Sequence, residues 1–363
     1  MIINNFFDKI TKSISKKNVK FIVVTHILPD KYLFLKSLNK IGDVKGIIPK
    51  QTSIDKNSLK IIKKDFSVFN EITKESVKDK RKVINFLKPL VKNNKFIILD
   101  IGGYFSYTVN DIYMEFRNNF LGVVEDTENG HIKYEKIKDI KIPVFSVARS
   151  PLKHSEDILV AYSSVYSAEN ILRYRNETLV GKKVTVLGYG KIGEHTVRDL
   201  TAKRARVFVY DKDPKKLIQA LAEGYNLISR RNFLKDSDII FCVTGNKSLS
   251  EFDLNKIKKE CYIFSITSSD DEFKFNKFKN FVKEKFDPIG ITLIKGRGKI
   301  HLVNYGNSIN FLHKAVIGNF IYLVQLEMIL AINELILKKH HGGIFELKDL
   351  KRNEIAKIWL KYF

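Results

Sequence analysis

The residues with the clearest chemical role form a G-x-G-x-x-G pattern, made by Gly188, Gly190 and Gly193. The pattern follows a β-branched, apolar run at 184–187 and opens a stretch with helical periodicity. A second apolar run ends roughly 20 residues later in an acidic residue, Asp211. This order predicts a strand–turn–helix–strand unit that binds a dinucleotide.

Each glycine has its own steric role in such a unit. Gly188 permits the tight turn after the strand, Gly190 leaves room for a pyrophosphate beside the backbone, and Gly193 lets helix and strand pack closely. The backbone N–H groups at the helix start, at Lys191 and Ile192, attract the phosphates. The alternative interpretation is a domain of the same shape that no longer binds a nucleotide.

Asp211 predicts which dinucleotide the unit prefers. Its carboxylate can accept hydrogen bonds from the ribose hydroxyls and would repel a 2′-phosphate, so NAD is favoured over NADP. Arg206 and Lys212 lie near Asp211 in the sequence, and their positive charges leave NADP as an alternative cofactor.

The composition favours a two-domain globular protein. The chain has 363 residues, of which 44% are hydrophobic, and this is enough for two cores. The only two cysteines, Cys242 and Cys261, lie in apolar strand-like runs, which excludes a disulfide framework and predicts a cytoplasmic location. Neither a metal-ligand motif nor an uncharged apolar run of about 18 residues is present, so neither a metal site nor a membrane span is expected.

The formal net charge of +24 raises the question of nucleic-acid binding. Most of the basic residues are lysines, and they are spread over the whole chain on the polar sides of helical patterns. A phosphate-binding stripe would cluster and would use more arginine. Nucleic-acid binding is therefore not expected to be the main function.

Strand and helix patterns alternate along the chain, which predicts parallel sheets covered by helices. Pro49 is expected to stop a short strand, and the acidic run 270–272 is interpreted as a solvated helix start. The apolar segment 311–337 predicts a long helix buried in a domain or a subunit interface, so a homo-oligomer is expected. Further strands are predicted within 21–28, 142–148, 183–190, 205–214, 238–245 and 261–267, within 95–104 before a Gly-Gly turn, and within 120–130 before an acidic loop. The second series also includes 227–231, and helices are predicted at 1–17, 31–42 and 155–176.

Around the glycine pattern the chain resembles the adenosylhomocysteinase (S-adenosyl-L-homocysteine hydrolase) family. The stretches that carry the likeness to its cofactor domain are 181–193, 205–214, 222–227, 243–246 and 301–307, and outside it 25–42, 97–103, 122–130 and 143–157. The resemblance implies an α/β protein in which a Rossmann NAD-binding domain, 166–308, is inserted in a second parallel α/β substrate domain, 1–165 and 309–363.

The resemblance also implies site residues. Lys153 and Asp157 match the pair that holds and deprotonates a ribose 3′-hydroxyl while NAD oxidises it, and His26 matches a histidine of the elimination step. The alternatives are a solvated i,i+4 salt bridge for the pair and a strand-end histidine satisfied by the backbone for His26. The cofactor-contacting positions that the resemblance implies are Thr127, Thr244, Gly245, Asn246 and, near the nicotinamide, Asn304.

Several positions depart from the family pattern. The acid that serves elimination is replaced by Ile101, and two of the family's histidines fall on Ser268 and Phe311. An asparagine and a cysteine fall on Ile158 and Tyr162. These changes remove groups that move protons, so the resemblance implies a retained oxidation step and an impaired elimination step.

Three hypotheses follow from the sequence. The first is an NAD-dependent enzyme that oxidises a hydroxyl of a nucleoside-like or sugar-like small molecule. The second is a catalytically inactive NAD-binding regulator or partner-binding subunit. The third is a genuine adenosylhomocysteinase in which other groups replace the missing ones.

Overall fold

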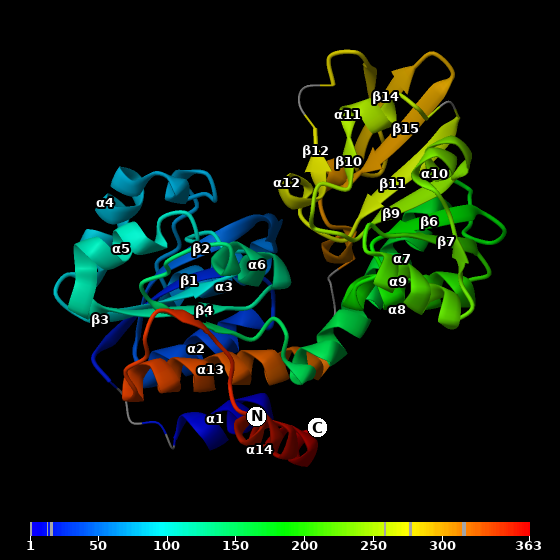
Figure 1. The fold of residues 1–363 in the computed structure, drawn as a ribbon. Coiled ribbons are helices and arrows are strands. Elements are labelled where there is room, and N and C mark those ends of the chain that lie inside the picture. Colours follow the sequence, from blue (N-terminus) through cyan, green and yellow to red (C-terminus); the bar gives the residue numbers. More distant parts are fainter. Residues whose placement is uncertain (1, 13, 15–16, 258, 276–277, 314–316) are drawn as a thin grey trace. The chain divides into compact units, whose positions relative to one another are not determined.

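The structure is a computed structural model that describes residues 2–12, 14, 17–257, 259–275, 278–313 and 317–363. The chain forms two compact units (Figure 1): unit 1 is Met1–Lys153 with Gly318–Phe363, and unit 2 is His154–Ile317. The sequence places the two crossings at 165/166 and 308/309 instead. The first crossing lies earlier because helix α7, His154–Tyr174, is continuous and its apolar residues belong to the core of unit 2.

Unit 1 contains a six-stranded sheet in the order β16-β5-β4-β3-β1-β2, and every pair of neighbours is parallel. Its central strands are almost wholly buried, as expected for a parallel sheet with helices on both faces. The strands are β1 (Val19–Ile27), β2 (Asp43–Ile54), β3 (Lys95–Asp100), β4 (Phe120–Glu125), β5 (Pro143–Ser146) and β16 (Gly343–Phe345).

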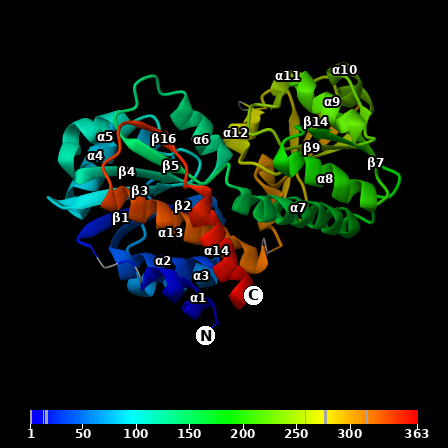
Figure 2. The same ribbon diagram turned by 60° about the horizontal axis from the view of Figure 1, so that its bottom comes forward.

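Helices cover both faces of this sheet. The α2 and α13 helices lie on one face and α4 and α5 on the other, while α1 and α14 pack beside α13 (Figure 1 and Figure 2). The helices of unit 1 are α1 (Ile2–Thr11), α2 (Lys31–Ile41), α3 (Lys56–Asp65), α4 (Lys80–Val91), α5 (Val109–Phe116), α6 (Glu128–Glu135), α13 (Ile321–Leu337) and α14 (Asp349–Tyr362).

The prediction that Pro49 stops its strand is wrong. β2 continues through Pro49, which pairs with Thr25 of β1, and ends at Ile54. Proline has no N–H to donate, but β2 is an edge strand of this sheet, and the isolated bridge on its outer side lies at Ile47, so the donor missing at Pro49 does not break a ladder.

The apolar helix α13 begins at Ile321, later than the predicted start at 311, and all its residues from 321 to 332 are buried. The helix Gly318–Leu337 is long and apolar enough to span a membrane, with a mean hydropathy of 1.8, yet 72% of its apolar 18-residue window is buried inside the protein. Its apolar surface is therefore covered within unit 1. The expected homo-oligomer stays a prediction, and this helix no longer supports it.

A buried ion pair fixes α13 within unit 1. Glu327 is fully buried, and its carboxylate accepts hydrogen bonds from Arg352 Nε at 2.8 Å and Ser150 Oγ at 2.5 Å. Gln325 Nε2 donates to Asp30 Oδ2 at 2.7 Å. These bonds connect the last fifth of the chain to the turns that follow β1 and β5.

Unit 2 contains an eight-stranded sheet in the order β13-β14-β15-β11-β9-β6-β7-β8. The six strands from β15 to β8 are parallel, and in chain order they run 3-2-1-4-5-6 across the sheet, the order of doubly wound dinucleotide-binding domains. The strands are β6 (Lys183–Leu187), β7 (Arg206–Tyr210), β8 (Asn226–Leu227), β9 (Ile239–Cys242), β11 (Glu260–Ser265), β13 (Val282–Lys285), β14 (Gly290–Lys295) and β15 (Gly298–Val303).

The α7, α8 and α9 helices share one apolar core with one face of this sheet, and α10 and α11 share another core with the opposite face. The helices are α8 (Lys191–Ala202), α9 (Pro214–Ala222), α10 (Arg230–Asp236), α11 (Glu251–Leu254) and α12 (Ser269–Glu272), and a separate pair of short strands is β10 (Leu249–Ser250) with β12 (Phe273–Lys274). The fold class predicted from the sequence is confirmed.

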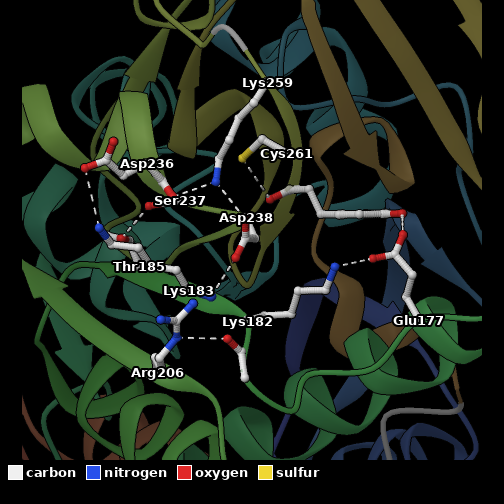
Figure 3. A network of polar contacts seen from close by, with 12 residues as sticks. Glu177, Lys182, Lys183, Thr185, Arg206, Asp236, Ser237, Asp238, Lys259 and Cys261 are labelled. Carbon is white, nitrogen blue, oxygen red and sulfur yellow. Dashed lines mark hydrogen bonds and ion pairs between the residues drawn. The ribbon is translucent and has the colours of Figure 1, made fainter.

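A polar network stabilises the amino-terminal edge of this sheet (Figure 3). Asp238 accepts from the backbone N–H of Lys183 at 2.8 Å and from Lys259 Nζ at 2.7 Å. Arg206 lies at the same edge, where its Nε donates to Gly181 O at 2.9 Å. Arg206 begins β7 and Asp211 follows its other end, so the two residues do not lie side by side. The inference that Arg206 could help to accept NADP is therefore wrong.

Candidate functional site

The turn between β6 and α8 has the geometry that the glycine pattern predicts. Gly188 has a φ of +100°, which favours glycine. A Cβ added to Gly190 would meet nothing within 4 Å, whereas one added to Gly193 would lie 2.1 Å from Gly188 O. The backbone at Gly190 is thus open to a ligand, and Gly193 is needed for the contact between helix and strand.

Asp211 is held in position directly beside this turn. Its Oδ2 accepts from the N–H of Tyr189 at 2.7 Å, and its Oδ1 accepts from the N–H of Asp213 at 2.9 Å. Lys191 and Ile192 are the first two residues of α8, so their N–H groups belong to the open end of that helix.

A pocket of about 260 Å³ lies at the carboxyl ends of β6, β7 and β9. This is the point at which the strand order reverses, where doubly wound sheets bind their ligands. Gly188, Gly190, Asp211, Lys212, Thr244 and Asn246 are among its lining residues. Five of these six are predicted cofactor residues, and Lys212 adds a cation near the carboxylate.

The acidic run 270–272 contains a residue whose role the sequence did not reveal. Glu272 is fully buried, so its interpretation as part of a solvated helix start is wrong. It accepts from the backbone N–H of Gly245 at 2.6 Å and from the hydroxyls of Thr244 at 2.8 Å and Thr267 at 2.5 Å. Because Glu272 lies 27 residues after Gly245 in the chain, only the tertiary fold shows that it shapes this loop of the pocket.

Asn304 lies in unit 2, in the turn that follows β15. It has a φ of +50°, and its Nδ2 donates to Ser308 O at 3.0 Å. In the structure its side chain therefore stabilises its own turn. The predicted contact with the nicotinamide stays a prediction.

In unit 1 the implied catalytic residues lie at the carboxyl ends of the strands. His26, near the end of β1, is hydrogen-bonded through Nδ1 to the buried hydroxyl of Ser53 on β2. Burial, followed by the positive charges of Lys50 and Lys31, lowers the pKa of His26 well below its usual value. The imidazole is neutral at pH 7, so it can accept a proton.

Lys153 forms a buried ion pair with Asp126, with Nζ and Oδ1 2.8 Å apart. Burial on its own would raise the pKa of Asp126, but Lys153 and, more weakly, Lys31 bring that pKa below its usual value. The carboxylate of Asp126 is therefore ionised at pH 7, and it holds the ammonium group of Lys153 at the end of β4.

Asp157 lies in the first turn of α7, in unit 2, while Lys153 is the last residue of unit 1. The exposed fraction is 6% for Asp157 and 7% for Lys153. A solvated salt bridge, the alternative considered from the sequence, does not describe side chains that are this deeply buried.

Thr127 is the N-cap residue of α6, and its hydroxyl is hydrogen-bonded on both sides. Its Oγ1 donates to Glu125 Oε1 at 2.7 Å and accepts from the N–H of Gly130 at 3.2 Å. Glu125 in turn accepts from the N–H groups of Gly102 and Gly103, each at 3.0 Å. Thr127 thus holds the carboxylate that shapes the Gly-Gly turn, and its implied cofactor contact stays a prediction.

Glu125 and Asp100 form a fully buried pair of carboxyl groups on neighbouring strands. Burial and then the charge of Asp100 raise the pKa of Glu125 to about 8, and burial also raises the pKa of Asp100. The pair therefore keeps a proton at neutral pH.

We expect this proton to make the stability of unit 1 depend on pH. The pKa of Glu125 is about 8 in the folded protein against a usual value of 4.5, so between these values the folded state binds the additional proton. Its contribution to the free energy of unfolding then falls as the pH rises from about 4.5 to about 8 and levels off above. Urea unfolding at pH 5.5 and pH 8.5 should show this loss in the parent protein and a smaller loss in Glu125→Gln. An equal loss in both proteins would contradict the assignment.

The residues that depart from the family pattern lie in the apolar core of unit 1, on the exposed side of α7, or in turns of unit 2. Ile101 is 4% exposed and belongs to the apolar core of unit 1. Ile158 and Tyr162 are exposed on α7, at 38% and 57%. Ser268 precedes the short helix α12, and Phe311 lies in a 3-10 turn.

Together, the fold and the glycine turn define a Rossmann dinucleotide-binding domain joined to a second, parallel α/β unit. Residues 162–314 match the family model described as S-adenosyl-L-homocysteine hydrolase, NAD binding domain. The chain is 26% identical to the adenosylhomocysteinase of Thermotoga maritima over 289 residues, which cover 76% of this chain and 70% of that protein. The chain is thus similar to adenosylhomocysteinases over most of its length, its segment 162–314 matches their NAD-binding domain, and its cofactor is NAD.

Two solved structures are also similar to this chain, at low sequence identity. A putative D-3-phosphoglycerate dehydrogenase from Ralstonia solanacearum is 12% identical with a TM-score of 0.46, covering 89% of this chain and 97% of that chain. The phosphoglycerate oxidoreductase from Vibrio cholerae is 14% identical with a TM-score of 0.40, covering 69% and 76%. These similarities concern the fold alone.

Proposed function

We propose that the protein is an NAD-dependent enzyme that oxidises a ribose-type hydroxyl of a nucleoside-like small molecule without completing the hydrolysis of its family. The observation that carries the proposal lies at the ends of β1, β3 and β4, where some of the implied catalytic groups are present and one is replaced. A buried cation–carboxylate pair, Lys153 and Asp126, is present with a neutral histidine, His26, whereas Ile101 replaces the elimination acid.

NAD supplies the acceptor for a hydride from the carbon that bears the hydroxyl. Lys153, held as a cation by Asp126, would hold the hydroxyl oxygen and stabilise the negative charge that develops on it. By the family resemblance, the carboxylate of Asp157 takes the proton. His26 would assist through its neutral imidazole, which is oriented by Ser53.

The same groups give no support to the elimination step. That step needs a general acid or base close to the leaving group, and the side chain of Ile101 has no ionisable atom. The side chain of Ile101 belongs instead to the apolar core of unit 1. We therefore expect the reaction to end at the oxidised product.

The test uses the full chain loaded with NAD and measures NADH absorbance after addition of adenosine, adenosine 5′-phosphate or their 3′-deoxy forms. We expect NADH with at least one 3′-hydroxylated compound and none with its 3′-deoxy form, because the reacting hydroxyl is then absent. S-adenosylhomocysteine should release no thiol. Absence of NADH with every compound would favour the inactive NAD-binding regulator, and release of thiol would establish a genuine hydrolase.

We also propose a cytoplasmic location. Cys242 and Cys261 are free and buried, and burial raises the pKa of the Cys261 thiol to about 12. Such thiols are structural rather than reactive, as expected of a chain that folds in a reducing compartment.

A further inference from the structure

Four charged side chains line the pocket of about 260 Å³ beside the glycine turn of unit 2. One is the carboxylate of Asp211, and the other three are the cations of Lys212, Lys216 and Arg230. Asp211 directly follows β7, at the strand end that holds a ribose in doubly wound domains. The three cations therefore line the same pocket as this ribose, and its 2′-oxygen is where NAD and NADP differ.

The carboxylate of Asp211 is engaged by the backbone. Its Oδ2 accepts from the N–H of Tyr189 at 2.7 Å, and its Oδ1 accepts from the N–H of Asp213 at 2.9 Å. These N–H groups stabilise the negative charge, so the carboxylate repels a nearby phosphate less than an unbonded one would. Each oxygen keeps a further lone pair for the ribose 3′-hydroxyl, which NAD and NADP share.

Arg230 is fixed at the wall of the pocket. Its Nη2 donates to Asp253 Oδ2 at 2.7 Å and to Ser248 O at 2.9 Å, and its side chain is also hydrogen-bonded to Tyr210. A guanidinium has more N–H donors than these three contacts use. Since 34% of the side chain is exposed, the remaining donors are accessible to a ligand in the pocket.

The two lysines are also available to a ligand. Lys212 is exposed, and no hydrogen bond or ion pair holds its ammonium group within the described part of the chain. Lys216 Nζ donates to Gln219 Oε1 at 3.0 Å, and this amide carries no charge. Both ammonium groups can therefore approach an anion in the pocket.

The carboxylates closest to these cations lie outside the lining of the pocket. Asp253, which pairs with Arg230, is 5% exposed, and Asp213 Oδ2 lies 3.4 Å from Lys215 Nζ. Glu272 is fully buried and accepts from the N–H of Gly245. Among the lining residues that the structure describes, Asp211 alone is negatively charged.

We propose that this pocket accepts NADP as well as NAD, with Lys212 and Arg230 binding the 2′-phosphate. A guanidinium binds phosphate oxygens through its planar fork, and an ammonium group binds them as a point charge. An arginine near the end of this strand is also what accommodates a 2′-phosphate in doubly wound domains. The inference concerns dinucleotide binding alone, so it does not rest on the proposed oxidation.

The test measures the binding of NAD and of NADP to the full chain by calorimetry. We expect NADP to bind within about tenfold of NAD, because cations at the 2′-phosphate offset the repulsion from Asp211. Raising the salt concentration should weaken NADP more than NAD, because only NADP adds a charged contact. A larger deficit of NADP, or an equal salt dependence of the two dinucleotides, would overturn the proposal.

Lys212→Gln is the diagnostic variant, and Lys215→Gln is its matched control. Lys215 lies three residues later and is exposed, but it does not line the pocket. Lys212→Gln should weaken NADP about tenfold and leave NAD nearly unchanged, whereas Lys215→Gln should change neither affinity. The assignment of Lys212 is refuted by an equal loss for both dinucleotides, or by a loss of NADP affinity that is no larger than in Lys215→Gln.

The outcome separates this inference from the proposed function. NADP binding that depends on Lys212, in a protein that forms no reduced dinucleotide with any nucleoside, would uphold the inference and refute the oxidation. NADH formation by a protein that does not bind NADP would uphold the oxidation and refute the inference.

Discussion

Gly190→Ala should strongly weaken NAD binding in a protein that still folds, whereas Gly193→Ala should destabilise unit 2 itself. A methyl group at Gly190 meets no protein atom within 4 Å, and its φ of −84° is accessible to alanine. The methyl group would instead occupy the place where a pyrophosphate approaches the backbone. We expect the affinity for NAD to fall about 100-fold, the equivalent of one or two lost charge-assisted hydrogen bonds.

At Gly193 the same methyl group would lie 2.1 Å from Gly188 O, so the start of α8 must move away from the strand. Overpacking of this kind costs about 1–3 kcal/mol or more. Two measurements distinguish the variants: calorimetric titration with NAD, and urea unfolding in the absence of NAD. Each variant serves as the control for the other. NAD binding of parental strength by Gly190→Ala would show that the dinucleotide does not cross this turn.

The second large effect is expected at Lys153. Lys153→Met leaves the carboxylate of Asp126 buried without its cation, which should lower the free energy of unfolding by about 3–5 kcal/mol. It should also reduce the rate of NADH formation about 100-fold or more, because the group that stabilises the reacting oxygen is gone.

A double variant separates these two effects. Lys153→Met with Asp126→Asn removes both charges, so it should recover much of the stability and none of the activity. Lys138→Met, at an exposed position, is the control and should change neither quantity. The proposed role of Lys153 is refuted if the single or double variant still forms NADH at the parental rate.

The nucleotide pocket could be predicted from the sequence because its determinants are local. A strand, a glycine turn and a strand-end acid lie within one short segment, and each restricts backbone geometry or charge directly. Gly188, Gly190, Gly193 and Asp211 accordingly lie where the pattern predicts, around one turn.

Residues that act through tertiary contacts could not be assigned in this way. Glutamate is usually a surface residue, but Glu272 and Glu125 are fully buried. Their carboxylates accept hydrogen bonds from backbone N–H groups of segments distant in the sequence. Lys153 forms an ion pair with Asp126, 27 residues earlier in the chain, a partner that the i,i+4 spacing does not suggest. Local periodicity contains no information about such partners.

The position of α13 in the chain has a consequence for biosynthesis. Helix α13 and strand β16, which complete unit 1, are translated only after the whole of unit 2. Until they emerge from the ribosome, strand β4 lacks its contact with α13, and Ser150 lacks its glutamate partner. A nascent chain at this stage presents an apolar sheet surface, and such surfaces make folding intermediates prone to aggregate until α13 is in place.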